Sequence, residues 1–255
     1  MNRRPTSRRA LFIAGASLSI LMVLASPLAA QEPADVLRDA ALVGQFSSLI
    51  ATIDMEITDR GTKNRTVELY VEQSPSEQKV LAQVVAPAFL NRMKFLTLVG
   101  PRQFDQWMAT SRGVRRLADT TGDERLFDSD FTVEDFIPPD PDDYDLELQD
   151  PQTIGGERVH VIRVTPVSID TDYAYRTIYV SQADRLLVRA EYFDTAGELV
   201  RLFELSERMT VNDRAFPEVA TMSTLSAGTS TDITARNVQT NVTIPARIFN
   251  RGNLQ

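Results

Sequence analysis

Residues 52–71 alternate between apolar and polar side chains, a pattern typical of a strand that buries one face. The apolar positions are Ile53, Met55, Ile57, Val67, Leu69 and Val71. Between the two runs, Asp59, Arg60 and Gly61 form a turn signal. A period of two on both sides of a turn predicts an antiparallel hairpin whose apolar side chains share one face.

The rest of the chain repeats this pattern at short intervals. Further strands are predicted at residues 79–85, 94–99, 103–109, 113–117, 145–149, 158–165, 175–181, 187–194, 198–211, 216–225 and 229–239. Nothing between them is long enough for a crossover helix, so the strands should form an antiparallel meander. We therefore expect a mainly β fold with a single large curved antiparallel sheet, because its apolar face must be buried.

Two segments depart from the strand pattern. Residues 33–49 carry apolar side chains at helical spacing, with Pro33 and Asp35 suited to a first turn, and predict one N-terminal helix. Residues 126–145 mix phenylalanines with acids, and Thr132 can cap a short helix over residues 132–136. This segment is either a mobile flap over an apolar opening or a hydrophobic plug that ties down a surface loop.

The first 30 residues have the three-part order of an export signal. Four arginines precede an apolar run over residues 10–25, small residues follow, and no acidic residue occurs before Glu32. The run is shorter than the roughly 20 residues that cross a bilayer. We therefore expect a cleaved signal peptide at residues 1–30 and one periplasmic domain at residues 31–255. Arg8 and Arg9 leave the twin-arginine and the general secretory routes both open.

Cysteine content and charge narrow the function classes. The chain has no cysteine, which excludes disulfides, thiolate metal sites and cysteine nucleophiles and favours a protein without a lipid anchor. The 27 basic and 35 acidic residues give a net charge of −8. Without the four arginines of the expected signal, residues 31–255 carry 23 basic and 35 acidic side chains, a net charge of −12. Such a surface repels nucleic acid.

Candidate chemical groups are few. His160 is the single histidine and lies in a strand pattern without a nucleophile motif, which favours a structural role. An acidic group could supply the carboxylate pair of a hydrolase, although surface solvation also explains it: Asp128, Asp130, Glu134 and Asp135. Acids alternate over residues 143–147, but Leu148 and Ile154 stand where a calcium-binding EF-hand loop needs Gly and Glu. No catalytic residue, metal site or cofactor is predicted.

Arg112, Arg115 and Arg116 crowd one turn and strand after Trp107 and form a local basic patch. The patch could hold an acidic partner or latch the acidic residues 128–135. It could equally be an edge strand charged against aggregation.

A signature lies in the middle of the chain. Residues 126–136 read Leu-Phe-Asp-Ser-Asp-Phe-Thr-Val-Glu-Asp-Phe and resemble the pattern Phe-x-Gly-Ser-Asp-Phe-(Ser/Thr)-x-x-Asp-Leu of the LolA-like outer-membrane lipoprotein-sorting proteins. Ser129, Asp130, Phe131 and Asp135 match this pattern, whereas Asp128 replaces the Gly. Residues 105–117 are similar to a second family passage, Trp-x-Tyr-x-Pro followed by Arg-Val-Arg-Arg-Ile, without its Tyr and Pro. Other family-like positions are Pro87, Phe95, Leu96, Pro166, Tyr175, Tyr192, Phe193, Asp194, Gly197 and Thr231.

The resemblance implies an incompletely closed antiparallel half-barrel wrapped around helices, with an apolar interior that shelters acyl chains. It implies a soluble periplasmic carrier or chaperone, not an enzyme, whose cargo is a lipoprotein or lipid and whose partners are an inner-membrane transporter and an outer-membrane acceptor. The residues expected to line the cavity or its mouth are Ile53, Met55, Ile57, Val67, Leu69, Val71, Trp107, Phe131 and Phe136. The alternatives are an outer-membrane β-barrel or structural envelope protein, and a periplasmic hydrolase that uses the acidic group.

Overall fold

The computed structural model describes residues 32–40, 46–74, 76–100, 103–117, 125–132, 134–136, 140–168 and 171–254. The expected signal peptide at residues 1–30 lies outside this range. Residues 31–255 form one compact unit. Within the described part of the chain, no helix is long and apolar enough to cross a membrane.

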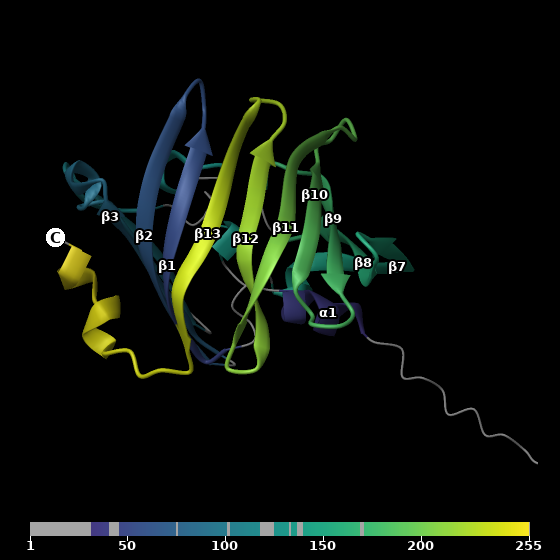
Figure 1. Cartoon of the computed structure of the whole chain (residues 1–255), viewed down its shortest axis with the longest axis horizontal. Helices are drawn as coiled ribbons and strands as arrows, with labels where there is room; N and C mark the ends of the chain where they lie inside the picture. The colour runs from purple at the N-terminus through teal and green to yellow at the C-terminus, as the bar shows by residue number, and fades with distance from the viewer. Residues whose placement is uncertain are drawn as a thin grey trace, which may run out of the picture. The chain divides into compact units, whose positions relative to one another are not determined.

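The described strands form one antiparallel sheet, as the alternation predicts (Figure 1). In chain order they are β1 (Ser48–Thr58), β2 (Thr62–Gln73), β3 (Gln78–Ala86), β4 (Lys94–Gly100), β5 (Gln103–Thr110), β6 (Gly113–Arg116), β7 (Tyr144–Ile154), β8 (Glu157–Pro166), β9 (Tyr175–Ser181), β10 (Leu187–Phe193), β11 (Leu199–Val211), β12 (Arg214–Thr224) and β13 (Thr229–Thr240). Their order in the sheet is β6-β5-β4-β3-β2-β1-β13-β12-β11-β10-β9-β8-β7. Strands β6 and β7 are the two edges, so the sheet is not closed into a barrel.

Two meanders meet in the middle of the sheet. The predicted hairpin is confirmed, since β1 and β2 are antiparallel with Ile53 opposite Val67. On its other side β1 pairs with β13, which places Met55 opposite Ile233 (Figure 1). The edges β6 and β7 are consecutive in the chain, and residues 117–143 connect them.

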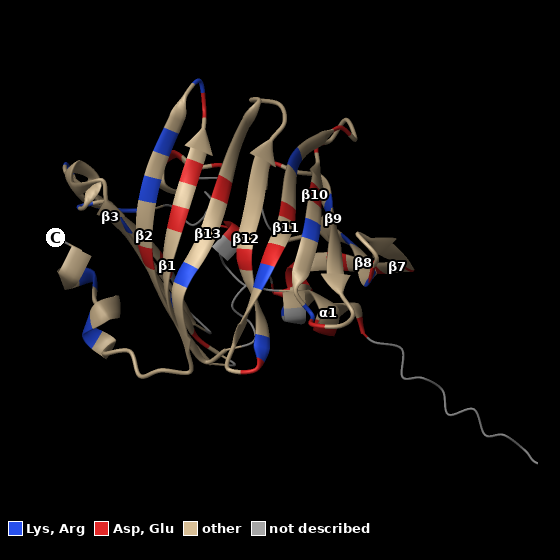
Figure 2. Cartoon of the chain, in the orientation of Figure 1, with Lys and Arg blue, Asp and Glu red and all other residues tan. Residues whose placement is uncertain are grey.

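The two faces of the sheet differ in chemistry. Alternate side chains of nearly every strand join one large apolar core, and we call the face that carries it the inner face. Charged residues recur along β1, β2, β11 and β13 (Figure 2), and on β1 Asp54 and Glu56 alternate with the core residues Met55 and Ile57, which places the charges on the outer face. Ion pairs there include Lys79 with Glu72 at 3.1 Å and Arg189 with Glu204 at 3.0 Å. Apolar burial on the inner face, at about 25 cal/mol per Å², is what holds the sheet curved over its contents.

The N-terminal helix is shorter than predicted. Helix α1 (Pro33–Ala40) buries Val36 and Leu37 in the inner-face core. The prediction extended the helix to residue 49, and this was wrong, because Leu49 already belongs to β1 and lies opposite Val71 and Thr240. Helical spacing continued into the strand because its first apolar residues face the same core.

Six 3-10 turns complete the described structure: η1 (Ala88–Leu90), η2 (Leu126–Asp128), η3 (Glu134–Phe136), η4 (Pro141–Asp143), η5 (Ala246–Phe249) and η6 (Arg251–Leu254). The helix predicted over residues 132–136 is only the turn η3. The capping interaction also differs from the expected one: an N-cap threonine would accept a hydrogen bond through its side-chain oxygen, whereas Thr132 is the donor. The Asp135 carboxylate accepts hydrogen bonds from the backbone N–H of Thr132 at 2.7 Å and from its hydroxyl at 3.1 Å.

A C-terminal segment covers part of the outer face. Ile244, Phe249 and Leu254 are buried in a small apolar cluster with Leu96 of β4 and Trp107 of β5. In Figure 1 this segment, which holds η5 and η6, lies beside β2 and β3. One edge of the sheet is therefore apolar on both faces.

Candidate functional site

The signature segment, residues 126–136, is fastened to the inner face. Phe131 is 1% exposed, and Leu126 and Phe127 are buried with it in the main core. An antiparallel bridge between Arg125 and Thr132 closes the segment on itself. In this conformation the segment is a plug that fills part of the half-barrel.

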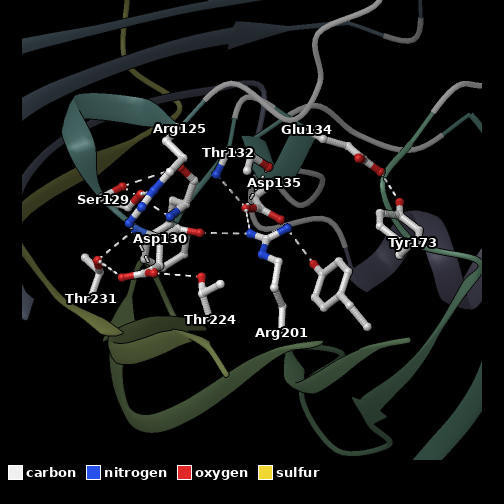
Figure 3. Close-up of polar contacts among 12 residues, drawn as sticks. Arg125, Ser129, Asp130, Thr132, Glu134, Asp135, Tyr173, Arg201, Thr224 and Thr231 are labelled. Carbon is white, nitrogen blue, oxygen red and sulfur yellow. Dashed lines mark hydrogen bonds and ion pairs between the residues drawn. The ribbon is translucent and has the colours of Figure 1, made fainter. Parts of the chain in front are cut away.

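Asp130 ties the segment to the end of β12 and the start of β13 (Figure 3). Its side chain is fully buried and accepts hydrogen bonds from the hydroxyls of Thr224 at 2.7 Å and Thr231 at 2.8 Å, and a further one from Thr229. The backbone N–H of Asp130 donates to the Thr231 hydroxyl at 2.9 Å. Arg125 supplies the countercharge at 3.3 Å. A buried carboxylate with this many donors holds a segment in one position.

Asp135 ties the other end of the segment to β11. Arg201 donates from Nη2 to the Asp135 carboxylate at 2.6 Å and to the backbone oxygen of Asp130 at 2.9 Å, and so bridges the two signature acids (Figure 3). Burial by itself would lower the pKa of Arg201, but the Asp135 carboxylate, its hydrogen bond to Arg201, Tyr192 and Glu134 together outweigh burial and raise that pKa. The Tyr192 hydroxyl donates to Asp135 at 3.1 Å, and burial, reinforced by the Asp135 charge, raises the pKa of Tyr192. Both groups therefore keep their protons.

Glu134 makes a third attachment, toward β9 and the residues before it. The Tyr173 hydroxyl donates to Glu134 (Figure 3). Arg176 lies 3.6 Å from the same carboxylate. Burial raises the pKa of Tyr173. The remaining acid, Asp128, is 68% exposed and lies 3.7 Å from Arg65.

A second pocket, of about 190 Å³, lies beside these attachments, and the charged and polar residues in its lining include Asp130, Glu134, Tyr173 and Arg201. Asp172 also lines the pocket, and the other two acids in the lining, Asp130 and Glu134, already accept hydrogen bonds from threonine, arginine or tyrosine side chains. Asp130, Glu134 and Asp135 thus have the surroundings of structural anchors.

An apolar pocket lies at the opposite end of the inner face. It has a volume of about 50 Å³ and lies over five neighbouring strands of the sheet, β3, β2, β1, β13 and β12. Its apolar lining residues include Leu49, Ile53, Leu69, Val71, Phe216, Ile233 and Ala235. Glu218 is the charged residue at its border. Phe216 stacks at a tilt against Phe46, with ring centroids 5.9 Å apart.

The expected cavity residues separate into three groups. Ile53, Leu69 and Val71 line the apolar pocket. Met55, Ile57 and Val67 share the inner-face core, and Phe131 is buried there with them.

The remaining two expected cavity residues lie elsewhere. Trp107 lies on the outer face, in the cluster under the C-terminal segment. Phe136 ends η3, and its side chain is outside the described part of the structure.

Sequence reasoning missed the partners of the signature acids. Arg201, Thr224 and Thr229 lie 66 to 99 residues from the acids they contact. Two partners, Thr231 and Tyr192, had a signal, since both occupy family-like positions. The threonines that flank the turn between β12 and β13 were a further hint, because their hydroxyls can donate hydrogen bonds to a buried carboxylate.

The other candidate groups also have clear places. The acidic segment is held by Arg65, Arg125, Arg176 and Arg201. Arg115 and Arg116 lie on the edge strand β6. His160 lies on β8, where burial first and the Arg185 charge second lower its pKa.

Similar solved structures share this fold. A DUF1329 family protein from Desulfovibrio piger has a TM-score of 0.79 and 21% identity, with 88% of this chain and 100% of that chain covered. An outer membrane lipoprotein-sorting protein domain, so described for Vibrio parahaemolyticus, has a TM-score of 0.77 and 18% identity, with 85% and 94% covered. A LolA superfamily protein from Nitrosomonas europaea has a TM-score of 0.68 and 16% identity, with 88% and 100% covered.

Comparison of sequences identifies a family but no curated relative. No curated protein matches the chain. A family model described as an uncharacterized protein matches residues 76–255, which is more than half of the chain. The chain therefore belongs to this family of uncharacterized proteins, and its fold is LolA-like.

Proposed function

We propose that the protein is a soluble carrier that shelters the acyl chains of a lipoprotein or lipid against its inner face. In this proposal it works in the periplasm and delivers its cargo toward the outer membrane. An inner-membrane transporter would load it and an outer-membrane acceptor would unload it. The observation that carries the proposal is the apolar pocket on the inner face of an open sheet whose outer face is charged.

The comparisons support a carrier in general terms. The domain from Vibrio parahaemolyticus is described as lipoprotein-sorting, and the protein from Nitrosomonas europaea as a LolA superfamily member. At 18% and 16% identity these likenesses concern the fold. The choice of cargo rests on the chemistry of the pocket.

The size of the pocket adds a requirement. An apolar cavity of about 150 Å³ can hold benzene, whereas this pocket has a volume of about 50 Å³. It can admit only the tip of a chain in the present conformation. Uptake must therefore separate packed elements of the inner face, and burying a dozen methylenes at about 0.8 kcal/mol each supplies about 10 kcal/mol toward that separation.

The acidic signature residues have a structural part in this proposal. Asp130, Glu134 and Asp135 hold the plug, and no reaction is assigned to them. We accordingly propose a protein without enzymatic activity.

Binding of a fluorescent acyl-chain probe tests the proposal. Ala235→Leu places a larger side chain in the pocket, and we expect it to weaken probe binding about tenfold, with Ala220→Val as a smaller change at the same site. Ala227→Leu, in the exposed turn between β12 and β13, is the matched control and should bind like the wild type. Thermal unfolding shows which variants are folded.

Native mass spectrometry of the protein from periplasm supplies a second measurement. Copurified lipid or acylated protein would support the proposal. A wild-type protein that copurifies neither and binds no acyl probe would overturn it, as would equal binding by the pocket variants and the control.

A further inference from the structure

Positive charge is concentrated in two stretches of an otherwise acidic chain. Residues 86–117 and 241–255 together contain eight basic residues and one acidic residue, Asp105. The other 34 acidic residues lie elsewhere in the sequence. Such segregation creates a local positive potential that the net charge conceals.

The fold brings these two stretches together. The C-terminal segment packs on the outer face of β4 and β5. The Lys94 ammonium donates to the backbone oxygen of Asn253 at 2.8 Å, and the Arg251 guanidinium lies 5.9 Å from the centre of the Trp107 ring. Strands β4 to β6 and the C-terminal segment thus form one surface, which we call the basic edge.

A pocket of about 550 Å³ opens in the basic edge. Its polar lining consists of Asn91, Arg92, Lys94, Thr110, Ser111 and Arg112, and none of its lining residues is acidic. Arg92 and Arg112 are exposed, and neither has an ion-pair partner among the described residues. Guanidinium groups beside hydroxyl donors are suited to phosphate oxygens.

An exposed aromatic side chain lies next to this pocket. Phe89, on the turn η1 two residues before Asn91, is 81% exposed, and Val85 before the turn is 39% exposed. An acidic protein partner would need only the cations. An aromatic and an aliphatic side chain among cations instead match the interface of an anionic bilayer, where rings enter the headgroup layer and cations meet phosphates.

We propose that the basic edge docks the protein on an anionic phospholipid surface, with lipid phosphates in the pocket and Phe89 in the headgroup layer. The acidic remainder of the protein is repelled by the same surface, which fixes the orientation of docking. This docking does not depend on the cargo. Vesicle binding and acyl-probe binding can therefore succeed or fail separately.

Vesicle flotation tests the docking. We expect wild-type protein to float with phosphatidylglycerol vesicles at low ionic strength and to be released from them by salt. It should not bind phosphatidylcholine vesicles, which carry no net charge. R92E/R112E should lose about tenfold or more in partitioning. R38E/R158E makes the same change in charge on α1 and β8, both exposed positions, and should lose far less. F89S should weaken vesicle binding and leave the binding of inorganic phosphate unchanged.

Contrary outcomes are well defined. Failure of the wild type to bind phosphatidylglycerol vesicles would overturn the proposal, and so would equal losses in R92E/R112E and R38E/R158E. If the protein bound inorganic phosphate but not vesicles, the ligand of the basic edge would be a soluble anion and the membrane proposal would be wrong. If the protein bound polyglutamate more tightly than vesicles, and F89S did not change that binding, the partner of the basic edge would be an acidic protein and the membrane proposal would be wrong. Thermal unfolding confirms that each variant is folded.

Discussion

Asp130 is the most heavily bonded residue of the signature segment, and its replacement gives the sharpest test of the plug. Three threonine hydroxyls and Arg125 donate to its fully buried carboxylate. Hydrogen bonds to a charged group each contribute about 1.5–3 kcal/mol. Asp130→Asn keeps the size of the side chain but turns one acceptor into a donor, so at least one buried hydroxyl loses its acceptor.

We therefore expect Asp130→Asn to lower the free energy of unfolding by about 1.5–3 kcal/mol. Asp130→Ala removes both acceptor oxygens and should cost about 3–5 kcal/mol, near the upper end for single substitutions. For a domain of this size the Asn variant should melt about 3–12 °C below the wild type.

Urea unfolding followed by circular dichroism measures these differences. Asp232→Asn is the matched control, because Asp232 follows Thr231 on β13, is exposed, and accepts a hydrogen bond from Thr221 at 2.5 Å on the outer face. Its cost should stay within about 0.5 kcal/mol. If Asp130→Asn and Asp232→Asn proved equally mild, the carboxylate would not hold the plug and the reasoning would fail.

Two further predictions concern single probes that the chain supplies. His160 is the sole histidine, so its imidazole titration by NMR can be assigned without ambiguity. Burial first and the Arg185 charge second lower the pKa of His160. We therefore expect a titration midpoint below 6.5, and we expect Arg185→Gln to raise it. Because the folded pKa is depressed, stability should fall as the pH drops from above 6.5 through the folded pKa, and a midpoint at or above 6.5 would contradict this. Phe249→Ala should cost about 3–5 kcal/mol and shift the emission of the sole tryptophan, Trp107, to longer wavelength, whereas Arg247→Ala on the same turn should leave the emission unchanged.

The strands were predictable because one buried face imposes a period of two on the sequence. Ile53 and Val67 were assigned to one face of one hairpin, and they lie opposite each other. The same rule could not say which residues beyond a strand would cover it. Trp107 is buried by Phe249 and Leu254, well over 100 residues away, and no local pattern links them.

The signature acids illustrate a second limit. Asp130 and Asp135 were singled out by their resemblance to a family pattern, but an acid in a sequence reads equally as solvated surface or as buried anchor. Burial and partners decide between the two, and the partners Arg201 and Thr224 come from strands distant in the chain. Long-range pairing, which the sequence of one chain does not display, determines the outcome.

The pairing of β1 with β13 also has a kinetic consequence. Leu49 lies opposite Thr240, so the central seam of the sheet joins residues separated by most of the folded chain. Closing a loop of this length costs about 4–5 kcal/mol of chain entropy before any contact repays it. During synthesis β1 must wait until β13, the last strand, has emerged, and until then β1 and β12 each expose an unpaired edge at what becomes the middle of the sheet. The protein should therefore fold slowly for its size, and its newly made chain should be most prone to aggregation just before completion.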